Sequence, residues 1–392
     1  MYFVPYLIFV LFFVFLYFPF RVLRAPFAPF AAGNFDIKNR MQAKHLIPLA
    51  LLALAACSSR PQQTEPTTNA QQAGMAEHAQ SAVGTSSATR AAALAFALPM
   101  PDATLYATRY LDWSDAARGR VVPAKLYLPV GSAAVPLVVF SHGIGGSREG
   151  YSYIGKFLAA NGYASLHLQH VGSDRSIWGG NMLQMVGRLQ NAAKDTEAIA
   201  RVQDLRFALD TLLADPELGK RVDASRIAAA GHSYGANTTM LAAGARVTRD
   251  GKALEFKDQR IKAAIIISAP PFYGESDFAP ILQPISIPSM HITATKDDID
   301  IPGYRSAASD RTKVFDAMGG VSKALAVFEG GSHSIFTDRL GTGGAELNPK
   351  VKAATRELAL AFLNSVLLGQ SDGLKAWPTL NAPLVASFKR NF

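Results

Sequence analysis

The stretch Gly231-His232-Ser233-Tyr234-Gly235 has the residue types and the spacing to present a reactive hydroxyl. It fits the pattern Gly-x-Ser-x-Gly, in which the serine occupies a sharp turn between a strand and a helix. A β-rich run over residues 226–230 precedes it, and a helical pattern over residues 236–243 follows at once. Glycines on both sides of the serine allow a strand and a helix to cross closely. The pattern predicts that Ser233 is a nucleophile, and the alternative is an ordinary glycine-rich turn.

A serine hydroxyl becomes an effective nucleophile only beside a base, an acid that orients the base, and donors for the oxyanion. His333 stands in the run Gly330-Gly331-Ser332-His333-Ser334, after the last predicted strand and before the final predicted helix. It is the predicted base. The alternative is a surface histidine, since the chain has eight histidines. His167 and His170 lie near the end of another predicted strand and are expected to pack or to line the pocket rather than to act directly.

The acid is expected between the serine and the histidine along the chain. The run Lys296-Asp297-Asp298-Ile299-Asp300 follows a predicted strand, so all three of its carboxylates are candidates. The acid would hold the imidazole in the correct tautomer and stabilise the imidazolium without taking its proton. The other interpretation is a solvated acidic turn or a weak cation site.

The loop Ser141-His142-Gly143-Ile144-Gly145-Gly146-Ser147 follows a short apolar run and is rich in glycine. In hydrolases with this type of serine turn, one oxyanion donor comes from such a loop and the other from the residue after the nucleophile. The predicted oxyanion donors are therefore the backbone N–H groups of Ile144 and Tyr234. His142 is expected to brace the loop rather than to serve as a second base, and the alternative for the whole loop is simple flexibility.

Strands and helices alternate in the pattern from about residue 97 to the end of the chain. Residues 104–113 and 120–128 are predicted as an antiparallel pair of strands. Further strands are predicted at 136–141, 163–169, 226–230, 262–268, 289–295 and 323–328, and helices at 151–161, 196–213, 236–243 and 346–368. Such alternation predicts an α/β fold with a mostly parallel central sheet and helices on both faces, as one domain over residues 97–392.

Two apolar segments precede this domain. Residues 1–20 are uncharged and long enough to span a membrane. Residues 41–56 combine a short polar start with an apolar run, and Leu54-Ala55-Ala56-Cys57 resembles the lipobox of bacterial lipoproteins. We expect Met41 to be the initiator, residues 41–56 to be a lipoprotein signal peptide, and Cys57 to be lipidated. Residues 1–40 would then be an over-extension, and a transmembrane helix at residues 1–20 is the alternative.

Residues 57–96 lack large apolar side chains over most of their length and are predicted to be a flexible linker between the lipid and the folded domain. Ser58 after the cysteine is typical of sorting to the outer membrane, so the expected location is the bacterial cell envelope, facing the periplasm. The net charge of +9 comes from scattered Lys and Arg residues, which argues against a nucleic-acid partner. No HExxH, Walker A or dinucleotide motif is present, so neither a metal nor a cofactor is expected.

The run from Pro136 to Asp174, together with Gly-His-Ser-Tyr-Gly, resembles the platelet-activating-factor acetylhydrolases and bacterial predicted dienelactone hydrolases of the α/β-hydrolase superfamily. The resemblance favours Asp298 as the acid, because it lies four residues before Pro302 as is common in this family; Asp297 and Asp300 remain alternatives. True dienelactone hydrolases use a cysteine nucleophile where this chain has Ser233, so a dienelactone is not the expected substrate.

The resemblance implies a serine esterase that hydrolyses carboxylic esters through an acyl-serine without a cofactor. The expected substrates are short-chain acyl esters, including acetyl esters of phospholipids. Residues 175–193 are expected either to pack on the domain or to form an acyl-binding cap. A peptidase or amidase on the same fold, and a non-catalytic envelope lipoprotein, are the alternative functions.

Overall fold

A computed structural model of the chain describes residues 101–392 apart from 302–303, 340 and 392. The predictions for residues 1–96, including the signal peptide, the lipidation of Cys57 and the linker, therefore lie outside the described residues. Within the described ranges, no helix combines the length and the apolar character needed to cross a membrane.

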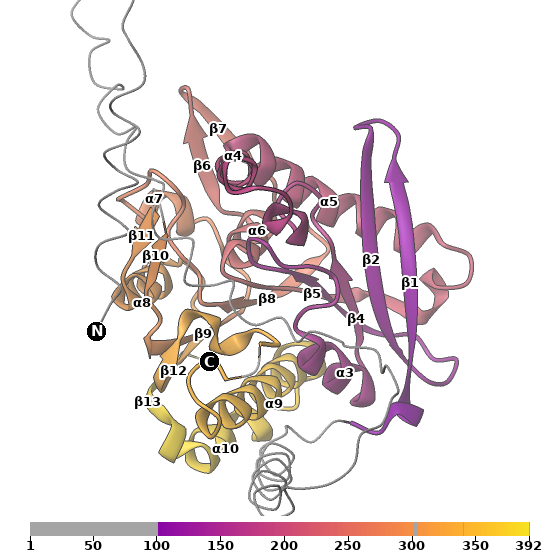
Figure 1. Cartoon of the computed structure of the whole chain (residues 1–392). Helices are drawn as coiled ribbons and strands as arrows, with labels where there is room; N and C mark the ends of the chain where they lie inside the picture. The colour runs from indigo at the N-terminus through magenta and orange to yellow at the C-terminus, as the bar shows by residue number, and fades with distance from the viewer. Residues whose placement is uncertain (1–100, 302–303, 340, 392) are drawn as a thin grey trace, which may run out of the picture. The chain divides into compact units, whose positions relative to one another are not determined.

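Nine strands form the central sheet in the order β1-β2-β4-β3-β5-β8-β9-β12-β13 (Figure 1). The six neighbouring strands from β4 to β12 run parallel to one another, whereas β1, β2 and β13 pair antiparallel at the two sides. The strands are β1 (Tyr106–Asp115), β2 (Arg120–Pro129), β3 (Val135–Ser141), β4 (Ala164–Leu168), β5 (Val222–His232), β8 (Ile261–Ile267), β9 (Ser289–Lys296), β12 (Lys323–Ser332) and β13 (Val385–Asn391). The predicted α/β class with a mostly parallel sheet is confirmed.

Helices cover both faces of this sheet (Figure 1). The helices are α3 (Ser152–Ala160), α4 (Met182–Ala192), α5 (Asp195–Ala214), α6 (Tyr234–Ala243), α7 (Ala279–Leu282), α8 (Ala308–Ala317), α9 (Leu347–Leu368) and α10 (Asp372–Leu380). Single 3₁₀ turns are η2 (Ala103–Leu105), η3 (Arg175–Trp178), η4 (Gly219–Arg221), η5 (His333–Phe336) and η6 (Ala382–Leu384). Two hairpins, β6 (Arg246–Arg249) with β7 (Lys252–Glu255) and β10 (Ile299–Ile301) with β11 (Tyr304–Ser306), stand apart from the sheet.

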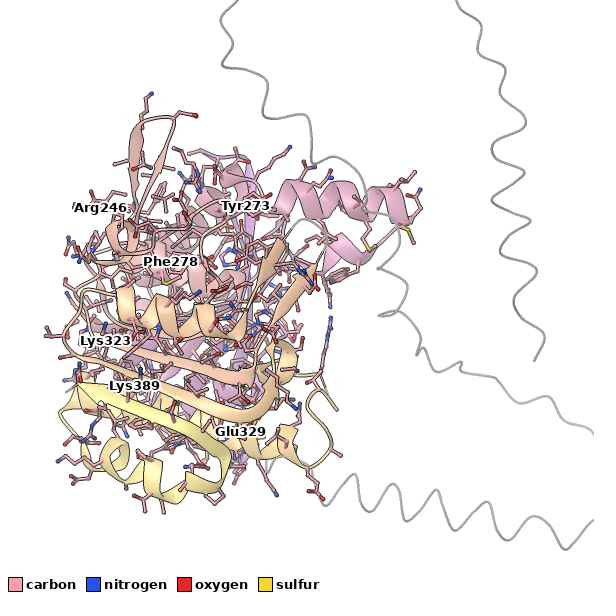
Figure 2. All side chains as sticks on the ribbon, turned by 90° about the vertical axis from the view of Figure 1, so that its left-hand side faces the viewer. Arg246, Tyr273, Phe278, Lys323, Glu329 and Lys389 are labelled. Carbon is pink, nitrogen blue, oxygen red and sulfur yellow. The ribbon has the colours of Figure 1, made fainter. Side chains whose placement is uncertain are left out.

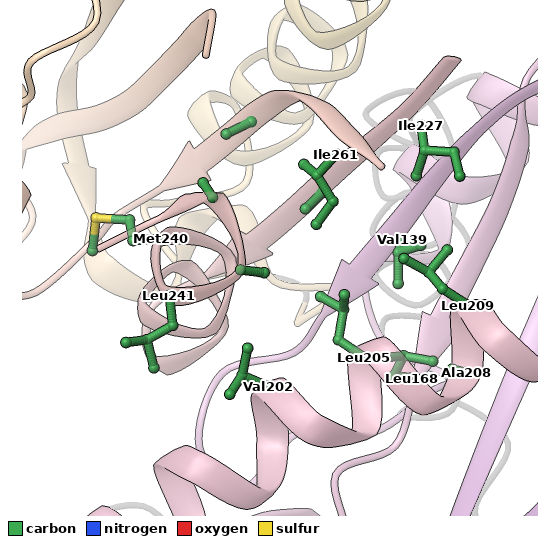
Figure 3. Close-up of a cluster of buried hydrophobic side chains, with 14 of the residues drawn as sticks. Val139, Leu168, Val202, Leu205, Ala208, Leu209, Ile227, Met240, Leu241 and Ile261 are labelled. Atoms are coloured by element: carbon green, nitrogen blue, oxygen red, sulfur yellow. The ribbon is translucent and has the colours of Figure 1, made fainter. Parts of the chain in front are cut away.

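The core has two layers because successive side chains of a strand point to opposite faces. On β3, Leu137 and Val139 are buried against α5 and α6, while Val138 and Phe140 are buried on the face that carries α3, α9 and α10. Figure 3 shows the first layer, in which Val139 of the sheet meets side chains of α5 such as Leu205 and Leu209. The central strands β3 and β8 are therefore almost wholly apolar, as strands buried on both faces require.

The C-terminal segment, for which the sequence offered no interpretation, completes the sheet. Helix α10 packs on α9, with the Trp377 indole donating to the Ala354 carbonyl at 3.0 Å. Strand β13 then pairs antiparallel with β12, and this edge strand carries the exposed Lys389 (Figure 2). Arg390, the next residue, is exposed as well. Charged side chains on an edge strand discourage pairing with other chains.

Candidate active site

Ser233 lies at a strained turn between β5 and α6. Its φ is 56° and its ψ is −122°, a conformation that L residues rarely adopt, and its side chain is 8% exposed. The turn is held by the hydrogen bond from the Ser233 N–H to the Ile267 carbonyl at 2.9 Å. Backbone strain of this kind persists where the surroundings over-determine it, typically at functional sites. The predicted strand-turn-helix context of Ser233 is present.

The two glycines of the motif are explained by backbone contacts. A Cβ on Gly231 would collide with the carbonyl of Gly235, and a Cβ on Gly235 would collide with the carbonyl of Ser141. Because these obstacles are backbone atoms, no rotamer change could relieve them. The close crossing of β5, α6 and β3 is therefore the reason that this turn tolerates only glycine on either side of Ser233.

His333 lies beside Ser233 although one hundred residues separate them in sequence. Its Nε2 is 2.8 Å from the Ser233 Oγ. Strand β12 loses its register with β9 between Phe328 and Ser332, and Gly330 adopts a φ of 75° in that irregular stretch. Such an irregularity redirects the chain at a strand end, which brings His333 to the same rim of the sheet as Ser233.

The carboxylate that is hydrogen-bonded to His333 is that of Asp297. The expectation that Asp298 would be this residue is therefore wrong, by one position in the chain. Asp297 Oδ1 accepts from His333 Nδ1 at 2.7 Å, and Asp297 is fully buried. Asp298 is exposed, and its Oδ1 accepts from the Ala308 N–H at the start of α8 at 2.9 Å. The two residues lie in the connection between β9 and β10, where their carboxylates have different partners, and only that of Asp297 faces His333.

The third candidate, Asp300, is also placed elsewhere. It is exposed and forms an ion pair with Arg305 across the β10–β11 hairpin, with Arg305 Nη2 at 2.7 Å from Asp300 Oδ2. The triad geometry therefore consists of Ser233, His333 and Asp297.

Asp297 is surrounded by donors that hold it in the charged form. Its Oδ2 accepts from the hydroxyls of Ser268 at 2.5 Å and Thr293 at 2.7 Å, and the buried guanidinium of Arg311 lies 3.5 Å from its Oδ1. Burial by itself raises the pKa of the carboxyl, but the hydrogen bond and charge of His333 and the charge of Arg311 outweigh it and lower the pKa. The carboxylate thus stays an acceptor that fixes the proton of His333 on Nδ1.

The loop that carries Ile144 reaches the serine turn directly. A Cβ on Gly143 would lie 3.2 Å from the Ser233 Cβ, so the loop and the serine are in near contact. Among the residues that the structure describes, neither the Ile144 N–H nor the Tyr234 N–H finds a hydrogen-bond acceptor. Both groups were predicted as oxyanion donors, and both are free to donate to a ligand beside Ser233.

A buried arginine that the sequence did not reveal is hydrogen-bonded to the backbone of the Gly143 loop. Arg201 of α5 is fully buried, and its guanidinium donates to the His142 carbonyl, to Ser173 Oγ at 2.8 Å and to Thr238 Oγ1 at 3.0 Å. It also lies 4.5 Å from the centre of the Tyr234 ring. Burial lowers its pKa to about 10, which leaves it charged at neutral pH. Arg201 therefore contacts both segments that carry the candidate oxyanion donors.

The other histidines near this rim are structural in their contacts. His142 Nε2 accepts from the His170 N–H at 3.1 Å and its Nδ1 donates to the Gly143 carbonyl at 2.7 Å, so His142 braces the loop. His170 bonds Asp204 and Ser141. His167 stacks on Phe140 with ring centres 5.0 Å apart. None of the three contacts Ser233.

The segment predicted to be a cap or a packing element is attached to the same loop. The Trp178 indole N–H of η3 donates to the Gly145 carbonyl at 2.9 Å. In α4, Leu183 is 85% exposed and Met182 is 39% exposed. These two apolar side chains are therefore not packed in the core.

Sequence comparisons relate part of the chain to known proteins. The family described as "Platelet-activating factor acetylhydrolase, isoform II" has a sequence model that matches residues 124–184, which include the Gly143 loop but none of the triad residues. The platelet-activating factor acetylhydrolase of Cavia porcellus is 24% identical over 294 residues, or 66% of this chain and 64% of that protein. The chain therefore matches less than two thirds of that relative's length.

A structural comparison supports the same architecture. The ferulic acid esterase from Streptomyces cinnamoneus superposes with a TM-score of 0.52 at 21% identity, covering 71% of this chain and 94% of that one. The fold is that of an α/β-hydrolase. A cold-adapted esterase from an Arctic intertidal metagenomic library gives a TM-score of 0.45 at 19% identity, covering 60% of this chain and 89% of that one.

Proposed function

We propose that the chain is a serine carboxylic-ester hydrolase that acts through Ser233, His333 and Asp297. The observation that carries this proposal is the pair of short hydrogen bonds on His333, 2.8 Å to the serine hydroxyl and 2.7 Å to the buried carboxylate. An imidazole held in this way accepts the serine proton as the hydroxyl attacks, and the carboxylate stabilises the imidazolium that forms.

The proposed reaction passes through an acyl-serine. Ser233 Oγ attacks the ester carbonyl, and the oxyanion accepts hydrogen bonds from the N–H groups of Ile144 and Tyr234. His333 returns its proton to the leaving alcohol, and then activates a water molecule that releases the acid. Loss of one oxyanion donor typically costs about 3–4 kcal/mol of transition-state stabilisation, so both donors matter to the rate.

The proposed substrates are esters of short acyl chains, with acetyl esters of phospholipids as the leading class. Similarity to platelet-activating factor acetylhydrolases over residues 124–184 and to the Cavia porcellus protein supports this choice. The exposed apolar side chains of α4, the helix that follows Trp178 along the chain, offer a surface for a lipid. We place no metal or cofactor in the reaction, since the triad and two N–H groups complete it.

The test of the substrate class is an acyl-length series with the purified protein. p-Nitrophenyl acetate, butyrate and octanoate would be compared with 2-acetyl and 2-palmitoyl phosphatidylcholines that share one 1-alkyl group. A preference of at least tenfold in kcat/KM for the acetyl over the long-chain ester supports the proposal. Equal rates across the series, or faster cleavage of a p-nitroanilide than of the matching ester, would argue against it.

We further propose that the protein is anchored to the cell envelope through a lipidated Cys57, facing the periplasm, with residues 1–40 absent from the mature chain. The lipobox-like run that ends at Cys57 supports this. Intact-mass analysis of protein from its native membrane would give a mass that begins at a modified Cys57. A mass that includes residues 3–30 would overturn it.

A further inference from the structure

His232, the residue before the nucleophile, bonds both sides of the site through its two ring nitrogens. Its Nε2 is 2.9 Å from the His333 carbonyl oxygen, and its Nδ1 is 2.8 Å from the Tyr151 hydroxyl. The Tyr151 hydroxyl in turn lies 3.4 Å from the Gly143 N–H. A chain of hydrogen bonds therefore runs from the Gly143 loop, through two buried side chains, to the backbone of His333.

The direction of each hydrogen bond in this chain is fixed by chemistry. A carbonyl oxygen only accepts, so His232 Nε2 must carry a proton and donate it to His333. Burial, aided by the nearby charge of His333, lowers the pKa of His232 to about 3, so the ring is neutral and Nδ1 is an acceptor. The Tyr151 hydroxyl then donates to Nδ1, and its oxygen accepts from the Gly143 N–H.

Tyr151 is held in place for this contact at a conformational cost. Its φ is 58°, in the left-handed region, and its side chain is 5% exposed. The ring packs against Phe140 with centres 4.7 Å apart and against His232 with centres 5.4 Å apart. Burial raises the pKa of its hydroxyl, which therefore stays protonated and able to donate. Tyr151 is the N-cap residue of α3, and an N-cap residue does not need a left-handed backbone. The left-handed conformation of Tyr151 therefore costs free energy that capping alone does not explain.

We propose that Tyr151 and His232 are positioning residues that couple the oxyanion loop to the backbone of His333 across Ser233. The proposal rests on the proposed function for its kinetic consequences. Gly143 precedes the candidate donor Ile144, so the Tyr151 bond sets where that N–H lies. The His232 bond to the His333 carbonyl sets the origin of the catalytic imidazole. His232, neutral and fixed in one tautomer, thereby keeps the oxyanion donor, the serine nucleophile and the histidine base in their relative positions.

The kinetic test is Tyr151→Phe, with Tyr163→Phe as the matched control. Tyr163 is also buried, and its hydroxyl donates to Asn364 at 2.8 Å, a contact outside the site. Each variant loses one buried hydroxyl, so both are expected to lose similar stability. Tyr151→Phe should lower kcat per titrated active site about tenfold with KM within threefold, because a misplaced donor weakens only the transition state. Tyr163→Phe should keep kcat within twofold.

A second pair of variants tests the two-sided bonding of His232. His232→Gln retains one donor and one acceptor, whereas His232→Leu retains neither. The glutamine variant should recover at least part of the kcat that the leucine variant loses, at equal active-site concentration. Equal kcat in both variants, or a Tyr151→Phe kcat within twofold of wild type, would overturn the coupling.

A measurement on the wild-type protein is independent of turnover and of variant folding. Long-range ¹H–¹⁵N spectra of the imidazoles should show His232 protonated on Nε2 alone between pH 5 and 8. The opposite tautomer, or a protonation step within that range, would overturn the coupling. If the wild type cleaves no ester and binds no fluorophosphonate, the proposed function fails, and the tautomer of His232 still decides this inference.

Discussion

His333 and Asp297 are joined by a 2.7 Å hydrogen bond between Nδ1 and Oδ1, while Asp298 turns to the start of α8. Two adjacent carboxylates thus have different tasks. The buried one orients the imidazole, and the exposed one satisfies a backbone N–H at a helix terminus. Because the two residues have the same charge and nearly the same position in the chain, they form a matched pair for mutagenesis.

Asp297→Asn is expected to lower kcat by about 10⁴-fold, because the amide stabilises the wrong tautomer of His333 and offers no charge to the imidazolium. Asp298→Asn is expected to keep kcat within about threefold, since an asparagine oxygen still accepts from a helix N-terminal N–H. Steady-state hydrolysis of p-nitrophenyl acetate measures both. A larger loss in Asp298→Asn than in Asp297→Asn would show that the observed bond is not the catalytic one.

Arg201→Met is expected to destabilise the domain by about 3–5 kcal/mol, because it removes a buried cation and leaves its acceptors without a donor. Arg206→Met, on the same helix, is the control. The Arg206 side chain is 48% exposed and lies 4.0 Å from Asp258, so its loss is expected to cost at most about 1 kcal/mol. Urea unfolding monitored by tryptophan fluorescence gives both free energies of unfolding. Similar free energies of unfolding for the two variants would show that the buried contacts of Arg201 do not stabilise the domain.

Gly235→Ala is expected to abolish soluble expression or the reactivity of Ser233, because the new Cβ would collide with the Ser141 carbonyl. Gly187→Ala is its control, since nothing lies within 4 Å of a Cβ at that position in α4. Alanine inside a helix is about 1 kcal/mol more favourable than glycine, so the control should raise the melting temperature slightly. A soluble, fully active Gly235→Ala protein would contradict the close crossing at the serine turn.

Acid is expected to destabilise the fold through its buried histidines. Burial lowers the pKa of His291 to about 3, whereas the unfolded chain has a histidine pKa of about 6.5. As the pH falls from about 6.5 toward 3, the unfolded chain binds a proton that the folded chain does not, so the free energy of unfolding falls in that window. Below the folded pKa, the dependence on this group disappears.

His291→Gln measures this contribution. Between pH 7 and pH 5 the wild type is expected to lose about 2 kcal/mol more stability than the variant, since only the wild type has this group to titrate on unfolding. Urea titrations at the two pH values provide the difference. Parallel pH dependence in the two proteins would mean that His291 is not held neutral in the folded state.

The sequence predicted most of this fold because long apolar runs and the glycine-flanked serine are local signals. The runs at β3, β8 and the second half of β5 are almost wholly apolar, which few structures other than a covered parallel sheet explain. Strand β13 was missed, because its exposed residues lack that pattern and the strand exists only through pairing with β12.

The site was predictable in part for the same reason. Ser233 and His333 follow strands and are marked by flanking glycines. The choice between Asp297 and Asp298 depended on which way each side chain points, and family spacing gave the wrong one. A usable signal was that Asp297 is the first acidic residue after the strand and therefore the nearer to the sheet rim. Arg201, Arg311, Tyr151 and the partners of His232 come from distant elements, so no local pattern could identify them.

The role of Ser233 as the nucleophile is tested most directly by covalent labelling of the wild type and Ser233→Ala with a fluorophosphonate, followed by mapping of the labelled peptide. We expect one label per wild-type chain, on the peptide that contains Ser233, and none on the variant. Turnover of p-nitrophenyl acetate should be lost with the label. A variant that is labelled and turns over at the wild-type rate, or a wild-type label on any other residue, would show that Ser233 is not the nucleophile.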